Sequence, residues 1–277
     1  MENLLPKAIP LNEIPKSESI TLLLYGPSGS GKTHFCGTAG SRSIIINIGR
    51  GIETLRSPSF TKRYSQANPR IVTISETRGS RGFTTIPKAF DDVCRSIDNL
   101  LEYESDSFDT ISIDDCTSLR DYAMSKGMAL SSDAKKASGF SASQKWGLAL
   151  PTVSDYGTEM SLMEQFINAY TEIFKEAKKN LILVAHERIS FNKPANIGEP
   201  PTIRKITPGF TGQTFPDRIP AYFDDVWHTQ TKKSAQTIYE LITEPDGITM
   251  AKTRQGGVLQ KVEIDPNFLS LLSRLRA

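Results

Sequence analysis

Cysteines, long apolar runs and a targeting segment are scarce or missing in this sequence, and each absence excludes a class of protein. Three cysteines in 277 residues, with no C-x-x-C pair, exclude a disulfide scaffold and offer no cysteine-based metal site. Apolar runs such as Leu181–Ala185 are far shorter than the ~18 residues that span a membrane. The N-terminus has no basic segment followed by an apolar one, so we expect no signal peptide, no membrane partner and a cytoplasmic location.

The chain also lacks an excess of either charge. It carries 33 Lys and Arg against 31 Asp and Glu, a net charge of +2. This balance excludes a protein coated in basic charge, although it leaves room for a local basic groove. With 38% hydrophobic and 23% charged residues, the composition is that of a globular protein with a sizeable core, not of a fibre or a disordered chain.

Short apolar runs alternate with amphipathic stretches over the first two thirds of the chain. The runs predict strands at Ile20–Tyr25, Ser43–Ile48, Arg70–Ser75, Thr110–Ile113 and Leu181–Ala185. Helical spacing predicts helices from Lys32 to about Thr38, over Pro87–Tyr103 and over Ser154–Lys179. Alternation of this kind is typical of βαβ crossovers, so we predict an α/β fold with a mainly parallel sheet flanked by helices.

The remaining segments are less regular. After Ala221, shorter alternating runs predict an antiparallel C-terminal meander at one edge of the sheet, at Asp225–Thr229, Thr237–Thr243 and Ile248–Lys252. We expect a mobile excursion at residues 125–150, a long irregular loop at 187–220 and a short helix around Asn267–Leu275. The predicted domains are an N-terminal arm or linker at 1–18, a core at 19–257 and a C-terminal tail helix at 258–277.

The sequence GPSGSGKT matches the phosphate-binding loop pattern G-x-x-x-x-G-K-[ST], between a predicted strand and a predicted helix. Its glycines let backbone N–H groups turn toward phosphates, Lys32 would reach the β- and γ-phosphates, and the Thr33 hydroxyl would bind Mg²⁺. The alternative is a structural glycine-rich turn. The predicted nucleotide-binding residues are Gly26, Pro27, Ser28, Gly29, Ser30, Gly31, Lys32 and Thr33.

A second acidic element, FDTISIDD, is an apolar strand that ends in two carboxylates, Asp114 and Asp115. Because ligands bind at the carboxyl ends of parallel strands, Asp114 is predicted to face the Mg²⁺ that Thr33 holds. Asp115 is a candidate to polarise the attacking water, or it caps the element that follows. The alternative is that both carboxylates are only turn residues after a strand.

Four elements follow one another along the chain: GPSGSGKT, ISIDD, LVAHE at Leu183–Glu187 and AKTR at Ala251–Arg254. In this order they resemble phage-type nucleotide-binding proteins with a RecA-like core, AAA-type phage ATPases that include single-strand annealing and recombination proteins. The resemblance covers roughly residues 18–255. It implies a RecA-like P-loop NTPase that uses ATP and Mg²⁺ and assembles into a ring or filament, with nucleotide at the subunit interface.

The same resemblance implies roles for three later residues. His186 matches a sensor that would respond to the γ-phosphate; the alternative is a histidine with a satisfied hydrogen bond at a strand end. Lys252 and Arg254 match a K-x-R pair that reaches the neighbouring subunit's γ-phosphate. Their alternative is an exposed basic edge strand that blunts aggregation.

The chain departs from the family at one position. Members commonly have Asp-x-Glu after the second strand, where the Glu activates water, but here the stretch reads Asn47-Ile48-Gly49. Loss of a general base costs ~10²–10⁴ in rate, so we expect slow hydrolysis unless Glu53 or Asp115 substitutes.

Single-stranded DNA is the partner that the resemblance implies, held by two loops at about 125–150 and 188–214. Both segments interleave cations with aromatic residues, which suits phosphate neutralisation and base stacking; the alternative is ordinary solvated loops. The candidate DNA-binding residues are Lys145, Trp146, Arg188, Lys193, Arg204 and Lys205.

The sequence therefore predicts an ATP-binding, ATP-hydrolysing homo-oligomer that acts on single-stranded DNA in phage recombination, annealing or replication. One alternative is a nucleotide-gated loader or structural assembly protein with weak catalysis. The other is a P-loop small-molecule kinase, in which Arg78 and Arg81 would serve as the arginine-rich lid.

Overall fold

The computed structural model describes residues 17–78, 84–137, 151–193, 200–233 and 237–277, together with Ala8, Pro10 and Glu13. Most of the predicted arm at 1–18 therefore lies outside the described residues. Within them, no helix is both long enough and apolar enough to cross a membrane.

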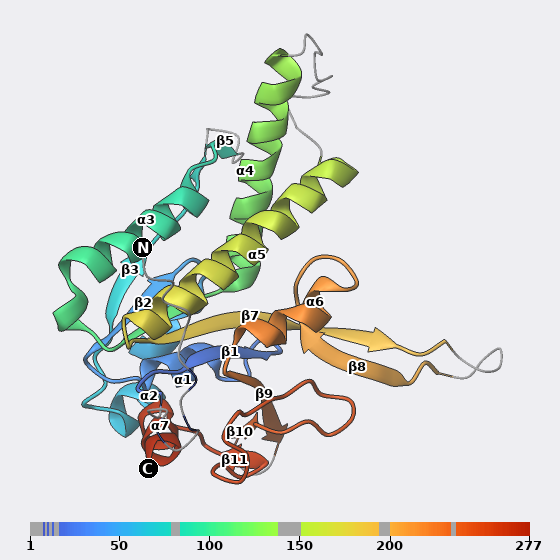
Figure 1. Ribbon diagram of the computed structural model, residues 1–277. Helices are drawn as coiled ribbons and strands as arrows, with labels where there is room; N and C mark the ends of the chain where they lie inside the picture. The colour runs from blue at the N-terminus through green and yellow to red at the C-terminus, as the bar shows by residue number, and fades with distance from the viewer. Residues whose placement is uncertain are drawn as a thin grey trace.

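One large sheet organises the described part of the chain (Figure 1). Its strands run in the order β11-β10-β9-β1-β7-β6-β2-β3, and β8 pairs with the outer half of β7. The strands are β1 (Thr21–Gly26), β2 (Ser43–Asn47), β3 (Arg70–Thr73), β6 (Thr110–Asp114), β7 (Asn180–Phe191), β8 (Ile203–Pro208), β9 (Asp225–Lys233), β10 (Thr237–Ile242) and β11 (Val262–Ile264). The six from β3 to β9 in this order are parallel, while β10 and β11 are antiparallel. A separate two-stranded sheet pairs β4 (Thr77–Arg78) with β5 (Thr84–Ile86).

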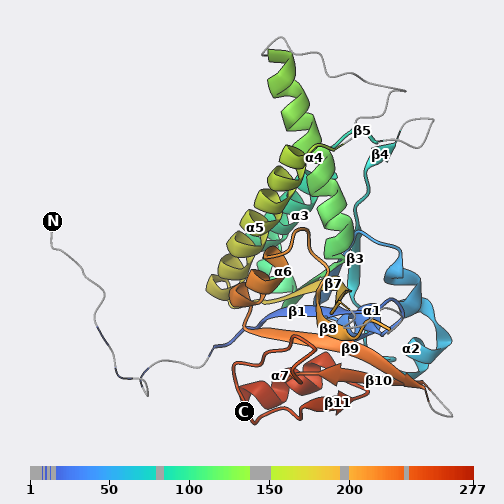
Figure 2. The same ribbon diagram turned by 90° about the vertical axis from the view of Figure 1, so that its right-hand side faces the viewer.

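Helices cover both faces of the sheet (Figures 1 and 2). They are α1 (Lys32–Gly37), α2 (Pro58–Arg63), α3 (Ala89–Tyr103), α4 (Cys116–Ala137), α5 (Val153–Glu176), α6 (Phe215–Arg218) and α7 (Phe268–Arg276), with 3₁₀ turns η2 (Gly51–Arg56), η3 (Ser105–Ser107) and η4 (Ile219–Tyr222). One core joins α3, α4 and α5 to one face, and a second joins α1 and α7 to the other.

The strand period of two explains why there are two cores. Along β1, Leu23 and Tyr25 enter the core beneath α3–α5, while Leu22 and Leu24 enter the core with α1 and α7. A strand buried on both faces needs apolar residues throughout, which is why β1 appears in the sequence as a continuous apolar run. The predicted fold class, a mainly parallel sheet flanked by helices with antiparallel C-terminal strands, is confirmed.

The expected mobile excursion at 125–150 is wrong for its first half. Residues up to Ala137 continue α4, and residues 138–150 lie outside the described part of the chain. Alanine, methionine, leucine and lysine in this stretch are strong helix formers and outweigh its serines. Gly127 sits where α4 approaches α5, since a Cβ there would lie 3.2 Å from Thr158 Cγ2.

The expected irregular loop at 187–220 is also wrong. Strand β7 continues to Phe191 and pairs with β8 as a ribbon that extends away from the body of the molecule (Figure 1), and α6 and η4 follow. β-Branched and aromatic residues at every second position, Ile189 and Phe191, favour this extension. The prolines of the segment had suggested a loop, but Pro208 stands at the end of β8, where it costs no ladder hydrogen bond inside the strand.

The C-terminal meander is corrected in two respects. Strand β9 is parallel to β1, so the antiparallel part begins only with β10. The stretch Ile248–Lys252 forms no strand; it makes isolated bridges from Thr249 to Ile206 and from Lys252 to Val226, and β11 is the outermost strand of the sheet instead. The helix expected near the C-terminus is confirmed as α7.

Candidate active site

The phosphate-loop motif lies where the sequence places it, between the end of β1 and the start of α1. Gly29 and Gly31 have φ angles of 78° and 89°, in the left-handed region that glycine adopts without a penalty. The loop is anchored from β9, because Ser30 Oγ and Thr229 Oγ1 share a hydrogen bond of 2.6 Å.

Lys32 is buried under this loop. Its Nζ donates to the carbonyl oxygens of Gly26 and Pro27, at 2.9 and 2.7 Å. Burial lowers the pKa of Lys32, and the carboxylates Asp114 and Asp115 oppose that shift. The ammonium group is therefore held inside the loop, on the side from which phosphates would be contacted.

Thr33, in the first turn of α1 after β1, and Asp114, the last residue of β6, meet although β7 lies between the two strands. The Thr33 hydroxyl donates to Asp114 Oδ2 at 2.5 Å. Burial raises the pKa of Asp114, and the hydrogen bond from Thr33 works against this. A Cβ at Gly51 would lie 2.5 Å from Thr33 Oγ1 and 3.3 Å from Asp114 Oδ2, so glycine keeps the space over this pair open.

Asp115 serves two groups with its two oxygens. Oδ1 accepts the backbone N–H of Ser118 at 2.7 Å and so caps the first turn of α4. Oδ2 lies 3.6 Å from His186 Nε2, and 3.1 Å from the position of a Cβ at Gly49. The carboxylate of Asp115 thus stands beside the position where the resembled family has its glutamate.

Glu53, the other proposed substitute, lies elsewhere. Its side chain is 70% exposed and pairs with Arg56 at 3.0 Å. The cavity beside the phosphate loop is lined by its neighbours Arg50, Gly51 and Thr54 but not by Glu53.

The phosphate loop borders a cavity of about 520 Å³. Asp114, Asp115 and His186 line it from the ends of β6 and β7, on one side of β1. Tyr239 lines it from β10, on the other side of β1, together with His34 of α1. The cavity therefore spans the phosphate loop from an acidic side to an aromatic side.

Residues 18–255 match the sequence pattern of the AAA domain family. The chain belongs to this family. No curated protein matches this AAA domain. Membership confirms the predicted P-loop ATPase domain, while a phage origin stays a prediction.

Two solved structures are similar to this AAA domain. One is the flagellar accessory protein FlaH from Methanocaldococcus jannaschii, 11% identical over 88% of this chain and 84% of that chain, with a TM-score of 0.40. The other is the KaiC-like protein PH0186 from Pyrococcus horikoshii OT3, 11% identical over 89% of each chain, with a TM-score of 0.41.

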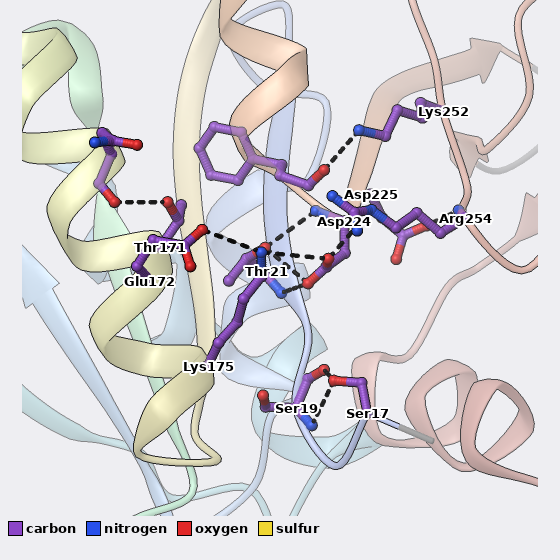
Figure 3. Close-up of polar contacts among 12 residues, drawn as sticks. Ser17, Ser19, Thr21, Thr171, Glu172, Lys175, Asp224, Asp225, Lys252 and Arg254 are labelled. Carbon is purple, nitrogen blue, oxygen red and sulfur yellow. Dashed lines mark hydrogen bonds and ion pairs between the residues drawn. The ribbon is translucent and has the colours of Figure 1, made fainter. Parts of the chain in front are cut away.

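Figure 3 shows Lys252 and Arg254 near Asp224, Asp225 and Thr21, the first residue of β1. The phosphate loop follows the other end of that strand. Lys252 Nζ donates to the carbonyls of Pro220 and Phe223, at 2.8 and 2.6 Å. Arg254 Nε lies 3.3 Å from Asp224 Oδ1, and its side chain is 52% exposed. Of the predicted K-x-R pair, Lys252 is therefore held by its own chain, while the guanidinium of Arg254 reaches the surface.

Two aspartates surround Arg254. Asp224 Oδ2 accepts the backbone and hydroxyl groups of Thr21, at 2.9 and 2.8 Å, which ties the start of β1 to the start of β9. Asp225 accepts the backbone N–H of Arg254 at 3.2 Å, and burial raises its pKa to about 6. Arg254 is thus positioned by both its backbone and its side chain.

The predicted DNA-binding residues divide into two groups. Lys145 and Trp146 lie outside the described residues. The other four, Arg188, Lys193, Arg204 and Lys205, lie on or next to the β7–β8 ribbon. Arg188 donates to the carbonyl of Gly212, and Lys205 pairs with Asp217 at 2.6 Å. Arg204 is exposed at the irregularity of the ladder, where the register between the two strands shifts.

His186 lies between the candidate nucleotide site and the β7–β8 ribbon. It lines the 520 Å³ cavity and also a second cavity of about 580 Å³, which includes Arg120, Arg188 and Phe210. The second cavity lies at the base of the ribbon, so one side chain faces both the candidate nucleotide site and the candidate DNA site.

Sequence reasoning missed the aromatic side of the cavity. His34 follows the motif directly and could have been noted as its neighbour, but nothing in the sequence relates Tyr239 to Gly31, 208 positions earlier. Their contact depends on the pairing of β9 with β1 and on the β9–β10 hairpin.

Proposed function

We propose that this AAA domain binds ATP with Mg²⁺, hydrolyses it slowly, and acts as a homo-oligomer on single-stranded DNA in phage recombination, annealing or replication. The observation that supports the nucleotide part is the 2.5 Å contact between Thr33 Oγ1 and Asp114 Oδ2. It joins a hydroxyl and a carboxylate, both oxygen ligands that Mg²⁺ accepts.

The residues present fit a magnesium nucleotide. The glycine at position 51 leaves the space over Thr33 and Asp114 free of side-chain atoms. Thr33 and Asp114 would hold the metal, and Lys32 with the loop backbone would hold the phosphates. When bound, Mg²⁺ supplies positive charge that offsets the charge of the phosphate oxygens.

The Asp114→Asn variant tests this assignment. Because an amide is a poorer magnesium ligand than a carboxylate, we expect its affinity for ATP with Mg²⁺ to fall at least about tenfold. Its affinity for ATP with EDTA should match that of the wild type. Titration calorimetry measures both values. The control is Asp109→Asn, one residue before the same strand, where the carboxylate pairs with Arg42 at the surface. Equal losses with and without Mg²⁺ would contradict the metal role.

Asp115 is proposed as the group that accepts the proton of the attacking water. It lines the cavity, it stands beside Gly49, and its Oδ2 faces His186. Because Asp115 also caps α4, it is less free to reorient than a glutamate on a loop. The expected result is hydrolysis that is present but slow.

We expect the wild-type turnover to lie below about 1 s⁻¹, under the ~10 s⁻¹ median of enzymes. Asp115→Asn should lower it by a further ~10²-fold or more, because the amide cannot accept the proton. Glu53→Gln should leave it unchanged, since that side chain is solvated and bound to Arg56. A phosphate-release assay on the three proteins decides the assignment, and the opposite pattern would transfer the role to Glu53.

The DNA part of the proposal is supported by the ribbon. Arg188 and Lys205 share one face, because they pair with Thr207 and Ser190, while Ile189 and Phe191 share the other. Arg188 and Lys205 already have partners in the protein, whereas Lys193 and Arg204 are exposed beside the exposed ring of Phe191. Exposed cations next to an exposed aromatic ring can contact both phosphates and bases.

The double variant Lys193→Ala/Arg204→Ala tests the ribbon. Each lost phosphate contact removes about 0.7 from the slope of log K against log salt for a single strand, so we expect the slope to fall by about 1.4. Fluorescence anisotropy with a labelled oligonucleotide at several salt concentrations measures it. Lys62→Ala/Arg95→Ala removes the same charge from exposed positions elsewhere and should not change the slope. An unchanged slope in the ribbon variant would exclude the ribbon as the DNA site.

A further inference from the structure

We propose that Tyr239 and His34 form the binding site for the nucleobase and that the ligand class is a purine nucleoside triphosphate. This inference rests on the proposed nucleotide function, and it assigns the part of the cavity that the motif does not explain.

The ring of Tyr239 lies directly against the phosphate loop. A Cβ at Gly31 would be 2.7 Å from Tyr239 Cδ1, closer than real Cβ contacts come, and 3.1 Å from Cε1. Gly31 is therefore required for two reasons, its left-handed φ and the space that the ring occupies. The ring of Tyr239 fills the space that a side chain at position 31 would occupy, and it therefore forms one wall of the cavity.

His34 extends this wall. Its ring is stacked with Tyr239, with centroids 5.7 Å apart and an interplanar angle of 15°. The edge contacts that His34 makes with Phe60 and Tyr64, at 4.9 and 5.2 Å, fix its orientation. Burial, assisted by the charge of Arg63, lowers the pKa of His34, which favours the uncharged ring. Two flat, uncharged surfaces are suited to stacking on a base.

The distribution of acidic and aromatic residues along the cavity indicates which way a nucleotide would lie in it. Asp114, Asp115 and His186 lie on the β6 side of the phosphate loop, where the metal and the terminal phosphate belong. The nucleoside is attached to the opposite end of the phosphate chain. It must therefore point to the side of β10, where Tyr239 and His34 lie.

The polar groups near the aromatic wall already have partners. In the recess beside Tyr239, Arg63 pairs with Asp265 at 3.4 Å, and Glu240 accepts from Gln230 at 2.8 Å. A base that is held by stacking, and not by hydrogen bonds to these groups, binds more tightly when its ring system is larger. The structure therefore favours purines over pyrimidines, with adenine and guanine bound similarly.

The test compares ATP, UTP and inorganic tripolyphosphate, each with Mg²⁺, on the full chain by titration calorimetry. Base stacking on an aromatic side chain is worth about 1–3 kcal/mol, a change of about 5- to 150-fold in affinity. We expect Tyr239→Ala to lose this factor for ATP and to bind tripolyphosphate as the wild type does. Tyr239→Phe should retain ATP binding, and Tyr103→Ala, the same change at an exposed position on α3, should have no effect.

The outcomes separate this inference from the proposed function. The inference holds if the wild type prefers ATP over UTP and Tyr239→Ala reduces that preference while tripolyphosphate binding is kept. It is overturned if Tyr239→Ala binds ATP as tightly as the wild type, or loses ATP and tripolyphosphate to the same extent. A wild type that binds tripolyphosphate as tightly as ATP overturns the base site but leaves the phosphate site standing. A wild type that binds neither overturns both.

Discussion

The Lys32→Ala variant will bind ATP too weakly to measure at micromolar protein concentrations, and its hydrolysis will fall by about 100-fold or more. The reason is that Lys32 Nζ is the cation enclosed by the loop, and its contacts to Gly26 and Pro27 aim it at the space that the loop encloses. Loss of one donor that stabilises developing charge costs ~10²–10³ in rate. Titration calorimetry and a phosphate-release assay measure the two effects.

Lys62→Ala is the matched control for this variant. Lys62 is exposed on α2 and lies outside the cavity, so its loss removes the same charge from the chain without touching the loop. Both variants should melt within a few degrees of the wild type. Tight ATP binding and normal turnover in Lys32→Ala would refute the nucleotide site itself.

The Arg254→Ala variant is expected to keep nucleotide binding and lose ~10³-fold or more of the hydrolysis that depends on assembly, the effect of removing an arginine that acts across an interface. Arg254 is held by Asp224, which is bound to Thr21 at the first residue of β1. The phosphate loop begins at the other end of that strand, about 16 Å away at ~3.3 Å per residue. Arg254 therefore lies well away from its own phosphate loop, and the role that we propose for it is on a neighbouring subunit.

Mixing two inactive variants tests this directly. Arg254→Ala subunits have an intact phosphate loop, and Lys32→Ala subunits have an intact arginine, so a mixture restores some complete sites at subunit boundaries. We expect hydrolysis in the mixture to exceed the sum of the separate variants and to peak at an intermediate ratio. Arg95→Ala, an exposed arginine on α3 paired with Asp92, should behave as the wild type. If the variants co-assemble by size-exclusion chromatography without any recovery, the trans role is wrong.

Those parts of the fold that depend on local pattern could be predicted from the sequence. β1 and β6 are buried along their whole length, so most of their residues are apolar, and the one carboxylate, Asp114, stands at the end of β6. The sequence alone predicts that Thr33 and Asp114 lie together, because both follow the carboxyl ends of parallel strands, and their hydrogen bond agrees with this. For these residues, the local sequence pattern was enough to predict where they lie in the fold.

The sequence was misleading where a residue's role depends on a distant partner. Gly127 looked like a loop residue, but it permits α4 to approach Thr158 of α5. Lys252 looked like a free cation, yet its ammonium is bound by two carbonyls of a segment about thirty positions earlier. Nothing in the sequence marked Tyr239 as a site residue, because its contact with Gly31 exists only after β9 has paired with β1.

Strand β7 belongs to two parts of the molecule. Its inner half is fixed between β1 and β6, its outer half belongs to the ribbon, and His186 stands at the point between them. From His186 to Phe191 the strand extends about 16 Å, so a tilt of about 10° at His186 displaces the far end by about 3 Å. A change of angle at His186, which lines the candidate nucleotide cavity, would therefore be enlarged along the ribbon. A tilt of this size would move Phe191 by a distance comparable to the spacing between stacked bases.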